Sequence, residues 1–193
     1  MSFFKKIFSK PSKDQEVKQQ EVHLSLDDAF VHHFINKGGK FLYCISEEEI
    51  ITNLNQILAE NNWKNITCLE ENLKKHLEES KTQPTTKFNK EFPFFTTCEH
   101  LISDNGDVLF SSNQLSTHKI ASLTDDFIVF AKTSQLVKNT GQGLTGIKSN
   151  FKGNIPTNIS SVKNYTLKKD DDNFLNYGNS NSKNLYLLLL EDL

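Results

Sequence analysis

The residues of this chain most suited to chemistry lie in one short turn. The segment Ser103–Asp107 reads Ser-Asp-Asn-Gly-Asp and places two carboxylates beside an Asn-Gly pair, between two apolar runs. Asn-Gly adopts positive φ at low cost, so apolar runs bounded in this way indicate strands joined by a tight connection. A carboxylate beside backbone amides in such a turn can act as a nucleophile, a base or a ligand anchor. We therefore predict Asp104 as the candidate catalytic residue.

Polar residues near Asp104 complete the predicted site. The predicted binding residues are Asn105, Gly106, Asp107, Ser111 and Lys119. Lys119 could hold an anion, and the lip of a sheet is where open α/β folds usually keep their ligand sites. The alternative is a plain hairpin turn whose Asp and Asn side chains cap their own backbone. The residues alone leave both interpretations open.

The charge composition limits the partners of the chain. Its 22 basic and 24 acidic residues give a net charge of −2, so no overall field favours nucleic acid. All the basic residues are lysines, and the planar fork with which arginine grips phosphate or carboxylate is missing. If an anion is bound, its ligands must be lysine side chains, backbone amides or helix N-termini.

The cysteine and histidine positions argue against disulfides and metals. Cys44, Cys68 and Cys98 are odd in number, widely spaced and placed in or beside apolar runs, as is typical of buried thiols in a reducing compartment. His32 and His33 are adjacent, so they diverge on a helix and suit chelation poorly. We predict no metal and no cofactor.

Two further motifs have simpler explanations. Gly141–Gly146 matches GxGxxG, but no strand directly precedes it and no acid ends a strand some 20 residues later, so a loosely helical or turn segment is favoured over a dinucleotide site. Cys98 and His100 would share one face of a strand and could form a nucleophile pair. A buried thiol beside a hydrogen-bonded histidine is the more common arrangement, and no third orienting group can be assigned.

The pattern of apolar residues predicts the elements that position these groups. Helical spacing begins at Leu26, and Ser46 with Glu49 forms a capping box before a helix that buries Ile50 and Leu54. Strands are expected at 41–45, 66–69, 94–102, 106–111, 126–131 and 185–190, with a further short helix at 71–79. Alternating strands and helices imply an α/β single domain with a mainly parallel sheet flanked by helices.

The N-terminal 20 residues differ from the rest of the chain, which divides into a basic flexible segment, 1–20, and an α/β domain, 21–193. Phe3, Phe4, Ile7 and Phe8 fall on one helical face among lysines, and a polar run follows Pro11. This pattern predicts peripheral contact with an anionic membrane surface or a partner, or else a frayed turn. Without a spanning or secretory segment, the expected location is cytoplasmic.

The domain resembles the LUD family of lactate-utilisation proteins, whose fold is similar to that of the NagB/RpiA/CoA-transferase superfamily. The segment Ile102–Asp107 looks like the turn of that family, followed by its strand at 108–110 and the next strand at 127–130. Residues 154–160 resemble the approach to its late site, and 185–190 resemble its closing strand. The chain departs from the family pattern at Asp104, where the family favours Glu, and it lacks a counterpart of the Gly-Pro-Ser-x-Thr-Ala-Asp motif.

The resemblance implies a protein of organic-acid metabolism that binds a small anionic metabolite or an acyl thioester near Asp104–Asp107. It also implies partner subunits that are iron–sulfur oxidoreductases of a lactate-oxidising system. The motif losses and the missing arginine favour an alternative, a divergent non-catalytic interaction module. A third hypothesis is CoA-transferase or hydrolase chemistry, with a thioester formed at Asp104.

Overall fold

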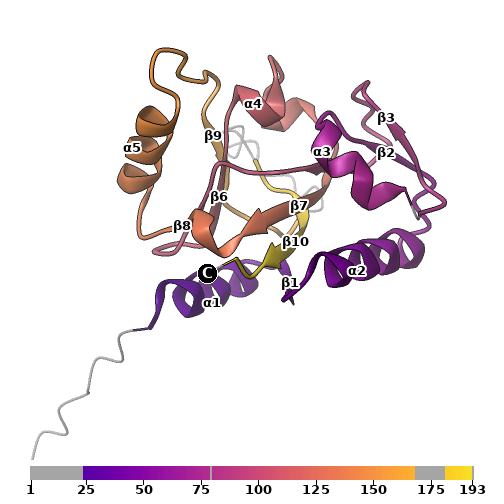
Figure 1. The fold of residues 1–193 in the computed structure, drawn as a ribbon, viewed down its shortest axis with the longest axis horizontal. Coiled ribbons are helices and arrows are strands. Elements are labelled where there is room, and N and C mark those ends of the chain that lie inside the picture. Colours follow the sequence, from indigo (N-terminus) through magenta and orange to yellow (C-terminus); the bar gives the residue numbers. More distant parts are fainter. Residues whose placement is uncertain (1–23, 79, 168–180, 193) are drawn as a thin grey trace, which may run out of the picture.

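The apolar runs of the sequence build a six-stranded, wholly parallel main sheet (Figure 1). In this computed structural model, residues 24–78, 80–167 and 181–192 are described. The strand order of the main sheet is β1 (Lys40–Cys44), β10 (Asn184–Leu190), β7 (Asp126–Lys132), β4 (Phe94–Thr96), β2 (Asn65–Thr67) and β3 (Gln83–Thr85). The predicted α/β fold with a mainly parallel sheet is confirmed.

The C-terminal apolar run forms the strand β10, which lies between the edge strand β1 and β7 in this sheet. Leu185, Leu187 and Leu189 face one hydrophobic cluster, whereas Leu188 and Leu190 face another. A strand buried on both faces needs no polar alternation, which explains the uninterrupted run of leucines. The prediction of a buried strand here is confirmed.

Helices cover one face of the main sheet. They are α2 (Glu47–Glu60), α3 (Glu71–Lys74) and the 3₁₀ turn η1 (Lys75–Leu77). As predicted, the Ser46 side chain caps α2 by accepting a hydrogen bond from the Glu49 amide at 3.3 Å. The Glu49 carboxylate, however, accepts from the amide of Ile45 rather than from that of Ser46.

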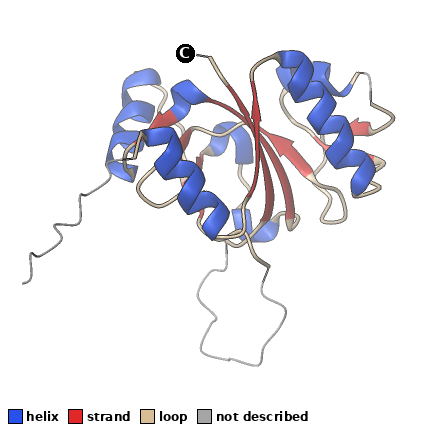
Figure 2. Cartoon of the chain, turned by 90° about the horizontal axis from the view of Figure 1, so that it is seen from below, coloured by secondary structure: helices blue, strands red, loops and turns tan. Residues whose placement is uncertain are grey.

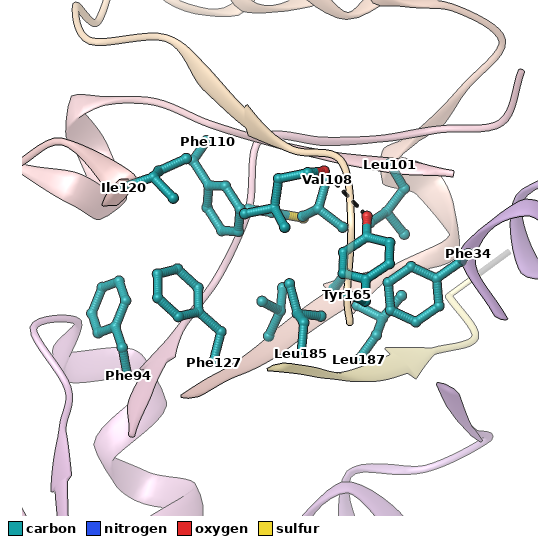
Figure 3. Close-up of a cluster of buried hydrophobic side chains, with 14 of the residues drawn as sticks. Phe34, Phe94, Leu101, Val108, Phe110, Ile120, Phe127, Tyr165, Leu185 and Leu187 are labelled. Carbon is teal, nitrogen blue, oxygen red and sulfur yellow. Dashed lines mark hydrogen bonds between the residues drawn. The ribbon is translucent and has the colours of Figure 1, made fainter. Parts of the chain in front are cut away.

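A second, four-stranded sheet covers the other face, together with α1 (Leu26–Asn36). Its order is β8 (Leu136–Val137), β5 (His100–Ile102), β6 (Asp107–Phe110) and β9 (Ser160–Val162). Figure 3 shows the aromatic and aliphatic side chains that fill the space between the two sheets. The expectation of one strand over 94–102 was wrong, because residues 97–99 carry the chain from β4 in the main sheet to β5 in the second.

Further helices complete the layers. The helix α5 (Thr140–Asn150) lies on the outer face of the second sheet, where Ile147 contacts Ile102 and Leu109 (Figure 1). Figure 2 shows the strands enclosed by helices on either side. The connections include α4 (Ser112–Leu115), η2 (Ile120–Ser122) and η3 (Thr133–Gln135).

The predicted N-terminal segment 1–20, with its amphipathic pattern at 3–8, lies outside the described residues. Within the described ranges, every helix is too short or too polar to cross a bilayer. No strand is expected from the sequence at 80–93, but these residues contain the edge strand β3. Pro84 fits there because an edge strand has one side without ladder hydrogen bonds.

Candidate functional site

The turn predicted from the sequence is a hairpin between β5 and β6 of the second sheet. Gly106 has a φ of +70° and donates its amide hydrogen to the Ile102 carbonyl at 2.7 Å. The Asn105 side chain accepts a hydrogen bond from the Asp107 amide at 3.1 Å. The hairpin with a self-capping Asn is therefore confirmed, and the turn lies at one end of an antiparallel pair rather than at the lip of the parallel sheet.

The backbone of this turn packs tightly against the C-terminal part of α1. A Cβ atom on Gly106 would lie 2.5 Å from the backbone nitrogen of Phe34. The buried Tyr165 hydroxyl donates to the Gly106 carbonyl at 2.5 Å, and the Tyr165 ring lies against Phe34 with centroids 4.3 Å apart (Figure 3). The His33 Nδ1 atom lies 2.9 Å from the Ser103 carbonyl oxygen. These contacts make the turn a joint between α1 and the second sheet.

The two carboxylates of the turn have different surroundings. Asp107 is 3 % exposed, and its Oδ1 accepts a hydrogen bond from the Lys37 ammonium at 3.0 Å. Asp104 is exposed, and its amide donates to the Lys138 carbonyl at 2.9 Å. The ion pair with Lys37 occupies Asp107, whereas the side chain of Asp104 faces solvent. Catalysis at Asp104 stays a prediction.

The remaining predicted binding residues lie away from the turn. Ser111 follows the opposite end of β6, is buried, and caps α4 in a capping box with Gln114. Lys119 is exposed and precedes η2. Asn105 and Gly106 stay with Asp104 and Asp107 in the hairpin. The structure thus separates Ser111 and Lys119 from the turn.

The topology of the main sheet points to another place for a ligand. From β2, the chain passes through α3 on the face covered by helices and reaches β3 at the edge of the sheet. From β4, it passes through the second sheet on the opposite face and reaches β7, in the other direction along the sheet. The connections therefore diverge between the neighbouring strands β2 and β4. In open α/β sheets, ligands bind in the crevice outside the carboxyl ends of the strands at such a switch point. We call the carboxyl ends of β2 and β4 the switch-point crevice, a name that follows this general rule and marks their place in the sheet.

The carboxylate of Glu70 lies at the switch-point crevice. Glu70 follows β2 and receives three hydrogen bonds from the end of β4. Its Oε1 accepts from the Thr96 hydroxyl and the Thr97 amide, both at 2.8 Å, and its Oε2 accepts from the Thr97 hydroxyl at 2.6 Å. Its own helix does not use this side chain as a cap. The three bonds hold the carboxylate across the ends of two strands.

A second carboxylate, that of Glu99, is linked to the first through polar side chains. Its Oε1 accepts from the Ser111 hydroxyl at 2.6 Å and from the side-chain Nδ2 of Asn113 at 2.8 Å. Gln114 accepts from the Ser111 amide at 2.9 Å, and its Nε2 lies 3.5 Å from the Thr97 hydroxyl. Ser111, a predicted binding residue, therefore belongs to the switch-point crevice rather than to the turn.

The free acceptor positions of these carboxylates define what the crevice can bind. A carboxylate offers about four acceptor positions, and three of those on Glu70 are occupied. Among the described residues, no donor reaches Oε2 of Glu99. The crevice thus presents oriented acceptors, which complement a ligand hydroxyl or ammonium group. Within the described part of the chain, no three His, Cys, Asp or Glu side chains gather as metal ligands would.

The thiols near the switch-point crevice are unreactive. Burial raises the pKa of Cys68, just after β2, to about 11. Burial raises the pKa of Cys98, between Thr97 and Glu99, still further. The thiolate is the reactive form of cysteine, so neither residue is poised as a nucleophile. The His100 Nδ1 atom lies 3.2 Å from the Gln135 carbonyl oxygen, which gives this histidine a structural partner.

The GxGxxG segment has a packing role. All six residues lie in α5, which is capped by Asn139. Gly143 lies against Ile102 and Leu109, and a Cβ atom on Gly146 would come within 2.7 Å of the His100 ring. The glycines let the helix approach the second sheet closely, in agreement with the interpretation favoured from the sequence.

Sequence reasoning missed Glu70. Its signal was present, since a carboxylate directly following the short apolar run 66–69 is expected at the carboxyl end of a strand. Glu70 falls between the predicted strand 66–69 and the predicted helix 71–79, so it was assigned to neither element. Its partners, Thr96 and Thr97, were read as the interior of one long strand, which hid the end of β4.

Comparisons with known proteins agree with the fold. No protein-family profile matches the chain, and no curated protein matches it either. Among solved structures, the chain is similar to a DUF162 family protein from Deinococcus radiodurans, with a TM-score of 0.60 and 10 % identity over 88 % of this chain and 100 % of that one. DUF162 is the LUD-like domain, so this likeness supports the inferred resemblance at the level of the fold alone.

Proposed function

We propose that the chain is a LUD-like domain that binds a small hydroxylated organic acid at the switch-point crevice. The observation that carries this proposal is the Glu70 carboxylate, which three donors orient across the ends of β2 and β4 and which retains a free acceptor position. A ligand hydroxyl would donate to this position. The choice of ligand class rests on the sequence resemblance to the LUD family, and the likeness to a DUF162 protein concerns the fold alone.

The crevice also needs a group that balances the charge of an organic acid. Two carboxylates repel an anion, so the ligand's own carboxylate must bind away from Glu70. Lys132 ends β7, the strand beside β4, and its side chain is 46 % exposed. Its Nζ lies 3.9 Å from Asp192, a loose pair that leaves the ammonium free to take a second partner. In this proposal, Glu70 binds the hydroxyl and Lys132 binds the carboxylate.

Comparing lactate with pyruvate tests the proposal directly. The two differ in the hydroxyl, and pyruvate would leave the acceptor on Glu70 unpaired. Titration calorimetry should show lactate binding about tenfold more tightly, as a lost hydrogen bond to a charged group predicts. Glu70→Gln should weaken lactate binding about tenfold, whereas Asp104→Asn should leave it unchanged. Equal affinity for both acids would overturn the role of Glu70 in binding the hydroxyl, and loss of binding only in Asp104→Asn would move the site back to the turn.

Thioester chemistry at Asp104 stays a separate prediction. The exposed side chain is accessible to an acyl-CoA, which keeps the prediction testable. Incubation with acyl-CoA followed by hydroxylamine should convert Asp104 to a hydroxamate that mass spectrometry detects. If Asp104 remains unmodified under conditions that trap a control acyl-enzyme, the transferase and hydrolase hypotheses are wrong.

Partner subunits of the iron–sulfur oxidoreductase type and a cytoplasmic location remain part of this proposal. They rest on the sequence resemblance, which the fold likeness supports. The alternative, a non-catalytic interaction module, is favoured by one observation: exposed apolar side chains cluster around α1 and β1. Affinity purification from the native cells, followed by mass spectrometry, would identify such subunits and distinguish a metabolic assembly from other partners.

A further inference from the structure

A partly apolar groove lies between α1 and β1, at the opposite edge of the main sheet from β3. Its volume is about 670 Å³. Its apolar lining residues are Leu24, Val31, Phe41, Tyr43 and Leu189, and its polar lining residues are Asp27, Asp28 and His32. Figure 1 shows α1 beside β1, where this groove is formed. The groove is independent of the switch-point crevice and of the function proposed there.

The edge strand that borders the groove is uncovered. Among the described residues, β1 pairs only with β10, so its other side presents unpaired backbone groups. Tyr43 is 47 % exposed and Ile45 is 66 % exposed, and Leu24 and Leu26 at the start of α1 are about as exposed. Native proteins usually cover or charge such an edge, because it can pair with other chains. We therefore expect another polypeptide segment or molecule to cover the exposed edge strand and the apolar groove beside it.

The charges around the groove are acidic. Asp27 and Asp28 lie in the first turn of α1, and Glu191 follows β10 with its amide bonded to the Cys44 carbonyl at 2.9 Å. Among the described residues, the lining contains no lysine. The groove therefore complements a segment that is apolar on one side and basic on the other.

The chain itself contains such a segment, connected directly to the groove. Phe3, Phe4, Ile7 and Phe8 are apolar, and Lys5, Lys6 and Lys10 are basic. The connecting residues 9–23 can span up to about 50 Å when extended. They end at Leu24, which lines the groove. We propose that residues 3–10 dock into the groove between α1 and β1, with the aromatic side chains inside and the lysines facing Asp27 and Asp28.

Tethering favours this occupant over the others. A tether of this length gives an effective concentration in the millimolar range, so a weak contact suffices for docking. A second copy placed symmetrically on α1 would bring the acidic rims of both copies together. An anionic membrane would meet the same negative charges. Docking of the basic segment neutralises them instead.

Disulfide trapping in the full chain tests this proposal. The three native thiols are buried, so new surface cysteines can be followed selectively. The variant Ser9→Cys/His32→Cys places one thiol beside the docked segment and the other at the groove. The control Ser9→Cys/Lys148→Cys places the second thiol on the exposed side of α5. The groove pair should form an intramolecular disulfide about tenfold faster than the control pair, because docking raises the local concentration.

Two further changes identify the forces involved. Adding Phe4→Ser/Phe8→Ser to the groove pair should remove the rate advantage. Adding Asp27→Lys/Asp28→Lys should reduce it several-fold, and high salt should weaken it in the wild-type background. Equal rates for the groove and control pairs would overturn the proposal.

The other occupants give distinct results that also overturn it. A covalent dimer as the main product of the groove pair would indicate a second copy. Equal rates together with flotation of the full chain on phosphatidylserine vesicles, lost in Phe4→Ser/Phe8→Ser, would indicate a membrane surface. The circular dichroism spectrum of each variant should match that of the parent, because Asp27, Asp28, His32 and Lys148 are exposed.

Discussion

The hairpin turn and the switch-point crevice contain the same kinds of residue but differ in what those residues contact. In the turn, Asp107 is paired with Lys37, and Gly106 is pressed against α1. In the crevice, hydroxyls and one amide orient Glu70, and no described lysine ammonium is paired with its carboxylate. A carboxylate with a cationic partner and a closely packed backbone stabilises the fold. A carboxylate oriented by hydroxyls at the edge of a parallel sheet is suited to ligand binding.

This difference shows that the residue types of a turn do not by themselves distinguish a ligand-binding site from a turn that packs against a helix. Asn-Gly with flanking carboxylates suits both, because positive φ and local capping are needed wherever a chain reverses direction. The topology of the sheet and the partners of each carboxylate make the distinction. Substitutions in the hairpin turn should therefore lower the stability of the fold, whereas substitutions in the switch-point crevice should weaken ligand binding.

The largest effect on stability is expected for Gly106→Ala. The new Cβ atom would approach the Phe34 nitrogen to 2.5 Å at a φ of +70°, so α1 and the hairpin would have to separate. We expect a loss of about 3 kcal/mol or more in urea unfolding. Gly153→Ala is the matched control, since its φ is +88° but no atom lies within 4 Å of its Cβ position. Equal losses in both variants would show that the turn is not a packed joint.

A smaller effect is expected for Asp107→Asn. The substitution removes the charge that pairs with Lys37 in a position that is 3 % exposed. We expect a loss of about 2 kcal/mol, because a hydrogen bond to a charged group is removed and the ammonium loses its partner. Asp104→Asn, three residues away and exposed, should change stability by less than about 0.5 kcal/mol. If the two variants are equally stable, the ion pair contributes nothing measurable.

Tyr165→Phe is expected to cost about 1 to 1.5 kcal/mol at neutral pH, since it removes the buried donor to the Gly106 carbonyl. Burial raises the pKa of Tyr165 well above its usual value. The folded state therefore retains a proton that the unfolded state loses near pH 10. The stability contributed by the protonated hydroxyl is complete below about pH 10 and falls by about 1.4 kcal/mol per pH unit above it.

The difference between wild type and Tyr165→Phe should consequently shrink between pH 10 and 11. Urea unfolding at each pH measures it, and comparing the two proteins cancels the contribution of the buried thiols. A difference that is constant over this range would mean that Tyr165 titrates alike in both states.

The smallest effect on stability is expected for Glu70→Gln. The amide oxygen can keep the two bonds to Oε1, and the amide nitrogen can donate to the Thr97 hydroxyl. We expect a change of less than about 0.5 kcal/mol in urea unfolding, although ligand binding is expected to fall. Glu70→Ala, which removes all three acceptors, is the contrasting variant. A large loss in Glu70→Gln would make the crevice carboxylate a structural group like Asp107.

The sequence alone determined the elements whose causes are local. The leucine run of β10, the cap at Ser46 and the self-capped turn at Asn105 follow from burial, hydrogen-bond supply and backbone preference within a few residues. These features identified an α/β domain with a mainly parallel sheet. They also placed a reversal of the chain between residues 102 and 107.

Only the tertiary structure decided which carboxylates are paired and which are available. The partner of Asp107 is 70 residues away along the chain, and those of Glu70 are 26 and 27 residues away. The split between β4 and β5 depends on a second sheet whose outer strands, β8 and β9, come from later parts of the chain. Such contacts arise from packing over long separations in sequence, so no local pattern could have distinguished the joint from the crevice.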